Sequence, residues 1–323
     1  MDQERRAYHE QTLALLRTVL PSPRWSNPQF LEWVYDRNPT GPVVAQDLDR
    51  DASRICHIGG VPTLLRSADK ERVFLLLLNS SSAPGEHGRG TYVKTLLELV
   101  ERTRKSGLGG VYGVTNASST GPVERVAQPR LARAAGIKKT GLVEPLPVKL
   151  HLPLALPAPG VTHTLVTPEY LDSADFARLA DAVEATPRPK SGWALHWTAD
   201  MLRWRLGWPG CRYTVHSNQD LMAVTTTTSE HHIRFGVLVM TASIRHGDRP
   251  VDLDRMLASI CWHHRVPAVV YAGFNPEVRV SGFKLSQERL PAPLNLAVQS
   301  VAKDIPDADF VMSTFEFIDF DAY

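Results

Sequence analysis

The residues best suited to chemistry in this chain form a glycine-spaced loop, His87-Gly88-Arg89-Gly90. An apolar run at 73–78, long enough for a buried strand, precedes it, and TYVKTLLELVER, with apolar residues at helical spacing, follows it. In such a strand–loop–helix unit the first helical N–H groups and the helix dipole attract an anion, and glycine lets a phosphate approach the backbone. Arg89, and His87 when protonated, would add charged donors. The sequence therefore predicts an anion site here, and the alternative is an ordinary exposed turn.

Length and composition indicate a globular protein. The 323 residues favour two domains, with 43% apolar and 22% charged residues, and a net charge of +2 is too small to argue for nucleic acid by itself. Cys56, Cys211 and Cys261 are too far apart for a disulfide framework or zinc spacing. The N-terminal segment is a charged amphipathic helix, and no apolar run approaches the ~18 residues of a membrane span. We therefore expect a cytoplasmic protein that does not cross a membrane.

Hydrophobic periodicity and turn signals predict the elements that position the loop. Two helices, near residues 3–20 and 27–37, open the chain. We expect strands at 42–48, 54–66, 109–116 and 145–152, and a helix near 122–135. A proline-rich stretch at 153–168 follows and is typical of a linker.

The pattern then repeats. Trp33 pairs with Trp204, Asn116 with Asn275, and Gly136 with Gly282, in the same order and with a steadily decreasing offset. In both copies a proline, Pro147 or Pro293, follows the glycine at the same spacing. Where the first copy has APGEHGRG, the second has only IRHGDRP at 244–250. We therefore expect a first domain at 1–152 with the anion loop, the linker at 153–168, and a degenerate second domain at 169–323.

The order of elements resembles the GNAT superfamily of acyl-CoA N-acyltransferases, and the duplication resembles its tandem members. The family loop Arg/Gln-x-x-Gly-x-Gly/Ala is similar to HGRGTY at 87–92, and GVYGVTNASS at 110–119 is similar to the end of the family's fifth strand. The resemblance implies an α+β fold of two tandem GNAT-like domains, each with a mixed, mostly antiparallel sheet flanked by helices. His87 and Tyr92 depart from the family loop. The tyrosine that many members use as general acid falls on Ala132, so no acid can be assigned.

The same resemblance implies a site for acyl-CoA as acyl donor, with no metal. The backbone at Ser80 to Ser82 would contact the thioester, the loop would hold the pyrophosphate, and the end of the fifth strand would open a cleft. The implied donor-binding residues are Ser80, Ser81, Ser82, His87, Gly88, Arg89, Gly90, Thr91, Tyr92, Asn116 and Ser118. Alternatively, the serines cap a strand end and Asn116 forms an Asx turn.

Acyl transfer to an amine also requires a general base. Candidates are His57, Glu86 and the acidic end of the chain with Asp319, Asp321 and the terminal carboxylate of Tyr323. Our catalytic candidates are Ser82, His57 and Asp321, each with a surface or packing role as the alternative. The pairs at 231–232 and 263–264 do not resemble a zinc half-site, because adjacent side chains diverge on a strand or a helix.

The leading hypothesis is an N-acyltransferase that moves an acetyl or longer acyl group from acyl-CoA to the amine of a small-molecule or amino-acid-like acceptor. The alternative is an aminoacyl-tRNA-dependent transferase on the same tandem fold, with tRNA bound by the arginine-rich segments 102–105, 130–139 and 245–265. A third possibility is a catalytically silent binding module. RNA binding should weaken steeply with salt, whereas CoA binding should weaken modestly.

Overall fold

The computed structural model describes residues 3–20, 27–115, 119–123, 142–208, 210–230, 232–245, 249–290, 292–306 and 309–320. The chain forms two compact units. The first contains 1–65, 70–145 and 293–311, and the second contains 66–69, 146–292 and 312–323. The predicted positions Asn116, Ser118, Ala132, Gly136, His231, Asp321 and Tyr323 lie outside the described residues.

Two helices open the first unit, as predicted. Helix α1 runs from Gln3 to Val19 and α2 from Pro28 to Asp36. Asn27 caps α2 by accepting a hydrogen bond from the amide of Gln29 at 2.9 Å, and Pro28 occupies the first helical turn. The apolar face of α2 is buried.

The first sheet has the strand order β1-β2-β3-β4-β16-β5. Its strands are β1 (Val44–Arg50), β2 (Ser53–Arg66), β3 (Glu71–Ser82), β4 (Gly110–Thr115), β5 (Leu142–Pro145) and β16 (Asn295–Ser300). Strands β3 and β4 are parallel, whereas the pairs β1–β2, β4–β16 and β16–β5 are antiparallel. The 3-10 turn η1 (Pro84–Glu86) and helix α3 (Thr91–Lys105) connect β3 to β4.

One face of this sheet packs against α3. The cluster combines Ile58, Leu75, Val111 and Ala297 of four strands with Leu96, Leu99 and Val100 of the helix, and Val123 of the segment at 119–123 adds to it. Because neighbouring residues on a strand point to opposite faces, His57 lies on the other face, where it meets Tyr35 of α2. The sheet therefore separates an apolar layer from a polar one.

The second unit has a similar mixed sheet, with the order β15-β6-β13-β11-β10-β9-β7. Its strands are β6 (Val148–His151), β7 (Thr162–Leu165), β9 (Thr214–Ser217), β10 (Leu221–Glu230), β11 (Ile233–Ser243), β13 (Val269–Phe274) and β15 (Phe283–Leu285). Only β11 and β13 pair in parallel within this order. Short strand β17 (Phe315–Glu316) pairs with β13, and β12 (Val251–Asp252) pairs with β14 (Val278–Arg279).

The remaining elements are mostly helical. They are α6 (Pro168–Leu171), α7 (Ala174–Glu184), α8 (Ala199–Leu206), α9 (Asp254–His264), the 3-10 turns η2 (Gln287–Arg289) and η4 (Phe317–Asp319), and the short strand β8 (Ala194–Leu195). Residues of β10, β11, β13 and α9 contribute to an apolar cluster of the second unit. No described helix is both long and apolar enough to cross a membrane.

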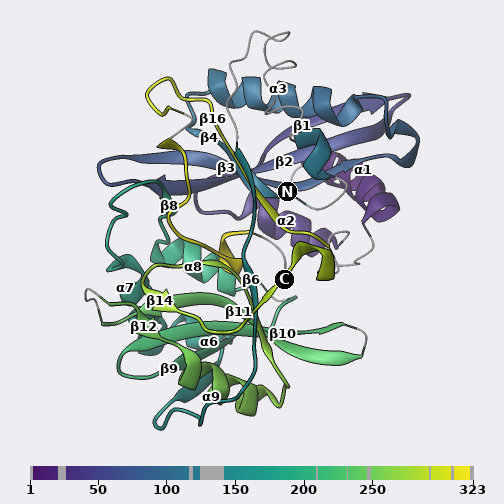
Figure 1. Cartoon of the computed structure of the whole chain (residues 1–323). Coiled ribbons are helices and arrows are strands. Elements are labelled where there is room, and N and C mark those ends of the chain that lie inside the picture. The colour runs from purple at the N-terminus through teal and green to yellow at the C-terminus, as the bar shows by residue number, and fades with distance from the viewer. Residues whose placement is uncertain are drawn as a thin grey trace. The chain divides into compact units, whose positions relative to one another are not determined.

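The two units exchange strands along the chain. Strand β16, drawn in yellow, pairs with β4 of the first unit, although it comes from the C-terminal part of the chain (Figure 1). Strand β6 follows Pro147 and pairs with β13 of the second unit. The strand expected at 145–152 is β6, which belongs to the second sheet, whereas β5 ends at Pro145 in the first sheet. The compact units also differ from the contiguous segments 1–152 and 169–323.

Candidate functional site

The glycine-spaced loop has the backbone of an anion cradle. Gly88 and Gly90 adopt left-handed conformations, with φ of 78° and 77°. Gly90 is the N-cap of α3 and provides no side chain to cap it. The first helical hydrogen bond runs from the amide of Lys94 to the carbonyl of Gly90 at 2.9 Å. The amides before Lys94 therefore point outward without an intrahelical acceptor.

Five consecutive or nearly consecutive amides at this end of α3 lack an acceptor. They belong to Gly88, Gly90, Thr91, Tyr92 and Val93, and none donates a hydrogen bond to a described residue. The side chains of His87 and Arg89 are exposed beside them and make no hydrogen bond or ion pair with the described part of the chain. Unpaired amides, the positive end of the helix dipole and a guanidinium group are each suited to hold a phosphate.

A buried glutamate braces the loop. Glu86 forms an ion pair with Arg50 at 2.7 Å and accepts a hydrogen bond from the Thr91 hydroxyl at 2.7 Å. The hydrogen bonds from Arg50 and then Thr91 lower the pKa of Glu86. Because Glu86 is ionised and engaged on both oxygens, we assign it a positioning role instead of the general-base role considered from the sequence.

The parallel strands β3 and β4 stop pairing just before the loop. Their ladder has only two residue pairs, Leu75–Val111 and Leu76–Tyr112, although β3 continues to Ser82. Beyond Leu76, no residue pair between β3 and β4 is formed in the part of the chain that the structure describes. Backbone donors on the edge of β3 that faces β4 are available to a ligand.

A bulge at Asn79 changes which residues face that edge. The carbonyl of Val73 accepts from the Gly109 amide on the β4 side, whereas the amide of Ala83 donates to Ile55 of β2. In a regular strand the backbone groups of Val73 and Ala83 would point to the same edge. Asn79 has a φ of 51°, which accounts for the reversal. After the bulge, we infer that the backbone groups of Ser80 and Ser82 face the unpaired edge.

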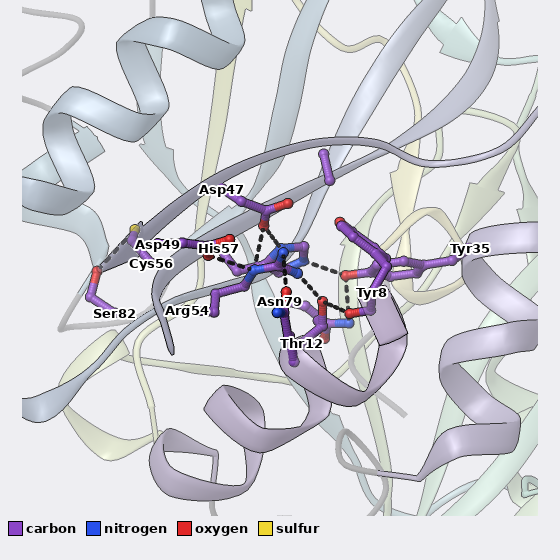
Figure 2. A network of polar contacts seen from close by, with 12 residues as sticks. Tyr8, Thr12, Tyr35, Asp47, Asp49, Arg54, Cys56, His57, Asn79 and Ser82 are labelled. Atoms are coloured by element: carbon purple, nitrogen blue, oxygen red, sulfur yellow. Dashed lines mark hydrogen bonds and ion pairs between the residues drawn. The ribbon is translucent and has the colours of Figure 1, made fainter. Parts of the chain in front are cut away.

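A buried polar network holds Asn79 in place (Figure 2). His57 lies between Asp47, whose Oδ1 is 2.5 Å from Nδ1, and Tyr35, whose hydroxyl oxygen is 2.6 Å from Nε2. Asn79 Nδ2 donates to the Tyr35 hydroxyl at 3.3 Å. Burial raises the pKa of Tyr35, so its hydroxyl keeps the proton that it donates to His57. When Tyr35 donates to Nε2, a hydrogen on His57 Nδ1 points to Asp47 Oδ1, which gives a one-directional chain from Asn79 to Asp47.

The sequence makes room for this network at Gly59. A Cβ atom at this position would lie 2.9 Å from the Tyr35 hydroxyl and 3.1 Å from the Leu78 carbonyl oxygen. Arg54 extends the network at its outer end, with Nε 3.2 Å from Asp49 and Nη1 near the Thr12 hydroxyl. The network therefore ties α1, α2 and the first three strands together.

The structure brings most of the predicted donor-binding residues together. Ser80, Ser81 and Ser82 end β3, and His87 to Tyr92 form the loop and the start of α3. The serine hydroxyls have different environments: Ser82 Oγ lies 3.3 Å from Cys56 Sγ, whereas Ser81 is buried. The catalytic candidate His57 is fully buried, with both ring nitrogens engaged. Asp319 is buried in the second unit.

The network residues Tyr35, Asp47 and Asn79 were missed by sequence reasoning. Asp47 could have been found, because pairing the two strands predicted at 42–48 and 54–66 as a hairpin places it opposite His57. Tyr35 belongs to α2, and no local pattern indicates which strand that helix covers.

Several solved structures share this fold at low sequence identity. A probable N-acyltransferase from Enterococcus faecalis V583, described as a conserved protein of unknown function, aligns over 92% of this chain and 70% of its own, with 11% identity and a TM-score of 0.55. A GCN5-related N-acetyltransferase from Anabaena variabilis aligns over 93% and 71%, with 10% identity and a TM-score of 0.53. Saccharomyces cerevisiae N-myristoyltransferase with bound myristoyl-CoA aligns over 92% and 80%, with 9% identity and a TM-score of 0.53. No family model and no curated protein sequence matches the chain.

The fold class expected from the sequence is thus confirmed. The chain has a mixed α+β architecture with mostly antiparallel sheets flanked by helices, as in these GNAT-type structures. At identities of 9–11% the likeness shows the fold, and the activity has to be argued from the site.

Four histidines meet in the second unit, which the sequence did not predict. His163 Nδ1 lies 2.6 Å from His216 Nδ1, and Thr225 Oγ1 lies 2.7 Å from His216 Nε2 and 2.8 Å from His264 Nε2. The ring of His263 stacks on that of His163. Within the described ranges, no group of three or more His, Cys, Asp or Glu side chains could hold a metal ion. The expectation of a protein without a metal stays a prediction.

Proposed function

We propose that this chain is an N-acyltransferase that binds acyl-CoA in its first unit and transfers the acyl group to an amine. The observation that carries the proposal is the set of unpaired amides at the start of α3, next to a strand pair that stops pairing. The fold shared with chains described as N-acyltransferases supports it.

Each part of the donor has a matching part of the first unit. The loop residues His87 to Tyr92 offer backbone amides and a guanidinium group to the pyrophosphate. The unpaired edge of β3 offers backbone groups of Ser80 and Ser82 to the pantetheine arm and the thioester. Asn116 and Ser118 remain proposed cleft residues beyond β4.

Among the described residues of the second unit, the start of α9 does not form an equivalent cradle. This helix begins at Asp254, without a left-handed glycine at its N-cap. The carboxylate of Asp252 accepts a hydrogen bond from the Asp254 amide at 2.9 Å, and Asp254 itself adds negative charge. A phosphate would be repelled there, which is why we place the donor in the first unit alone and regard the second as a degenerate copy.

Direct acyl transfer proceeds in three steps. The amine nitrogen attacks the thioester carbon, the carbonyl oxygen gains negative charge, and CoA leaves as the thiol after the amine proton has been transferred. Backbone amides of β3 can stabilise the oxyanion, which is often worth several kcal/mol. Ser82 would act through its backbone, since its hydroxyl is directed at Cys56.

His57 would act on this chemistry indirectly. It is fully buried, so it cannot touch a substrate in this conformation. We propose that Asp47, His57 and Tyr35 fix the Asn79 bulge, which aims the backbone of Ser80 and Ser82 at the thioester. The direct base is not among these residues, and Asp321 remains a candidate from the sequence.

An amine on a small-molecule or amino-acid-like acceptor remains our proposed acyl acceptor. The tRNA-dependent alternative is weakened in one segment, because Arg104 and Lys105 both contact Glu101 and Arg102 donates to the Ala45 carbonyl. Salt bridges of this kind fit a solvated helix face. The three cysteines are free, and we propose a cytoplasmic location, where free thiols persist.

The proposal is tested by donor binding and product formation. We expect acetyl-CoA or a longer acyl-CoA to raise the midpoint of thermal unfolding, and free CoA thiol to be released when a panel of primary amines is added. Gly90→Glu should abolish both effects, because a carboxylate would occupy the phosphate position. Unchanged unfolding with every acyl-CoA tested, or undiminished binding in Gly90→Glu, would contradict the proposal. A tRNA donor would instead show binding that collapses between low and moderate salt.

A further inference from the structure

Strand β7 is the edge strand of the second sheet, and apolar burial contributes little to holding it there. It forms four residue pairs with β9, from Thr162–Ser217 to Leu165–Thr214, and no other described strand pairs with it. None of its residues is buried, and the Leu165 side chain is about half exposed. A strand with so few buried contacts opens easily unless another interaction holds it.

The histidine of this strand supplies such an interaction. His163 lies directly opposite His216 of β9, with 2.6 Å between their Nδ1 atoms. The ring of His263 in α9 stacks on the His163 ring, with 4.3 Å between the ring centroids and 15° between the ring planes. His163 therefore joins β7 both to the neighbouring strand and to the end of the helix.

A bridging hydroxyl extends the contact into the sheet. Thr225 Oγ1 of β10 lies 2.7 Å from His216 Nε2 and 2.8 Å from His264 Nε2. His163, His216, Thr225 and His264 thus form a chain of three hydrogen bonds, and each bond holds one hydrogen atom. A neutral imidazole carries one N–H and the hydroxyl carries one O–H, so the neutral chain holds about four such hydrogens.

This chain accepts one more proton without losing a hydrogen bond. Its bonds use three hydrogens, and the outer nitrogens, Nε2 of His163 and Nδ1 of His264, hold one each. A second added proton places two hydrogens between one donor and acceptor pair, so that hydrogen bond breaks. A proton on His263 also places a like charge on the face of the His163 ring.

No carboxylate offsets a positive charge on this histidine cluster. Within the described ranges, none of its four rings forms a hydrogen bond or ion pair with an aspartate or glutamate: His163, His216, His263 and His264. The titratable and charged groups that face the rings are the rings themselves and Arg234 of β11, which acts on His264. Burial, and then these neighbours, lower the pKa of His216 well below 6.5 and that of His264 to about 4.

Other histidines of the chain have the opposite arrangement. Three of them lie within 4.0 Å of an aspartate, in the pairs His9–Asp36, His57–Asp47 and His151–Asp254. An aspartate favours the protonated ring, whereas the histidine cluster loses contacts when it gains protons. The cluster is therefore suited to respond to pH.

We propose that the histidine cluster is a proton-operated clasp on strand β7. In its neutral state the cluster holds β7 on β9 and on the end of α9. Once more than one proton is added, β7 leaves the sheet and exposes the edge of β9. Opening takes up protons, because a released histidine returns to its ordinary pKa of about 6.5. The clasp is thus closed above about pH 6.5 and opens as the pH falls below it. It belongs to the second unit and does not depend on acyl-CoA binding in the first.

Hydrogen–deuterium exchange of the full chain at pH 7.5 and pH 5.0 tests the clasp. Labelling times are scaled for the pH dependence of intrinsic exchange, and EDTA is present throughout. At pH 5.0 we expect the protection of Thr162 to Leu165 to fall at least tenfold and to stay at least tenfold below that of β11 and β13. Releasing one histidine with a pKa of about 6.5 shifts the opening equilibrium about 30-fold at this pH.

Matched variants connect the effect to His163. His163→Gln keeps a hydrogen-bonding group opposite His216, and His163→Phe keeps a ring to stack on His263, but neither side chain titrates. In both variants the protection of β7 at pH 5.0 should stay within threefold of its value at pH 7.5. His232→Asn removes an exposed histidine of the same unit that makes no contact with the cluster, and it should behave like the unaltered chain.

Three results would overturn the proposal. The first is a change of less than threefold in the protection of β7 between the two pH values. The second is protection of β7 equal to that of β11 and β13 at pH 5.0, which marks unfolding of the whole unit. The third is a loss in His163→Gln or His163→Phe as large as that in His232→Asn. If both His163 variants fail to fold, the first two comparisons decide. None of these results bears on the acyltransferase proposal, because acyl-CoA binding and thiol release are measured separately.

Discussion

Replacing Gly90 by alanine separates the cost of a strained backbone from the loss of a phosphate contact. Gly90 has a φ of 77°, and a Cβ added there would meet no atom of the protein within 4 Å. Gly107, near the end of α3, is the matched control: its φ is 72° and its Cβ would also lie in open space. Gly90→Ala and Gly107→Ala should therefore cost the same free energy of unfolding.

The expected magnitudes differ sharply between stability and binding. A left-handed alanine costs about 1 kcal/mol, which lowers the midpoint of thermal unfolding by about 2–4 °C in a unit of this size. At Gly90 the added methyl group also occupies the side from which a phosphate reaches the amides. Losing one charge-assisted hydrogen bond of about 2 kcal/mol weakens binding about 30-fold.

The assay pairs thermal unfolding with a calorimetric titration of acetyl-CoA. We expect equal unfolding shifts for the two variants, unchanged affinity for Gly107→Ala and an affinity reduced about 30-fold for Gly90→Ala. Equal affinities in the two variants would refute the cradle, because the backbone strain is common to both.

Three further changes test the network and the histidine cluster. Tyr35→Phe leaves Asn79 and His57 without their shared partner, so the free energy of unfolding should fall by about 1–3 kcal/mol and kcat should drop, while the dissociation constant of acetyl-CoA changes less than about threefold. Gly59→Ala places a methyl group 2.9 Å from the Tyr35 hydroxyl and should destabilise the protein by about 1–3 kcal/mol, whereas Gly85→Ala, with open space around its Cβ, should be nearly neutral in urea unfolding. Burial lowers the pKa of His216 well below 6.5, so on acidification the unfolded chain binds this proton before the folded chain does. The contribution of His216 to the free energy of unfolding should therefore be constant above about pH 6.5 and fall by up to about 1.4 kcal/mol per pH unit below it. Free energies from urea unfolding that do not change down to pH 5 would contradict this.

Local patterns were sufficient to predict the loop and its elements. The apolar run that begins β3, the glycines of the loop and the helical spacing of α3 lie next to one another in sequence, so short-range signals determine this part of the fold. The observed strand extends through Ser80 to Ser82, which the sequence suggested would follow it. Polar residues at the end of a strand can continue the strand or begin the following loop where the neighbouring strand has stopped pairing.

Long-range pairing could not be predicted in the same way. Strands β6 and β16 follow corresponding prolines, Pro147 and Pro293, yet each pairs in the unit that the chain order assigns to the other. A short apolar strand carries no signal for which sheet it joins. The contact between Tyr35 and His57 joins a helix to a strand, so no local pattern indicated that His57 would be buried with both ring nitrogens engaged.

Hydrogen–deuterium exchange of the full chain with and without acetyl-CoA tests the central claim most directly. The account predicts slower exchange in peptides that cover Gly88 to Val93 and Ser80 to Ser82, with no change around α9 of the second unit. Unchanged exchange in the first-unit peptides at saturating acetyl-CoA, or protection confined to the second unit, would contradict it.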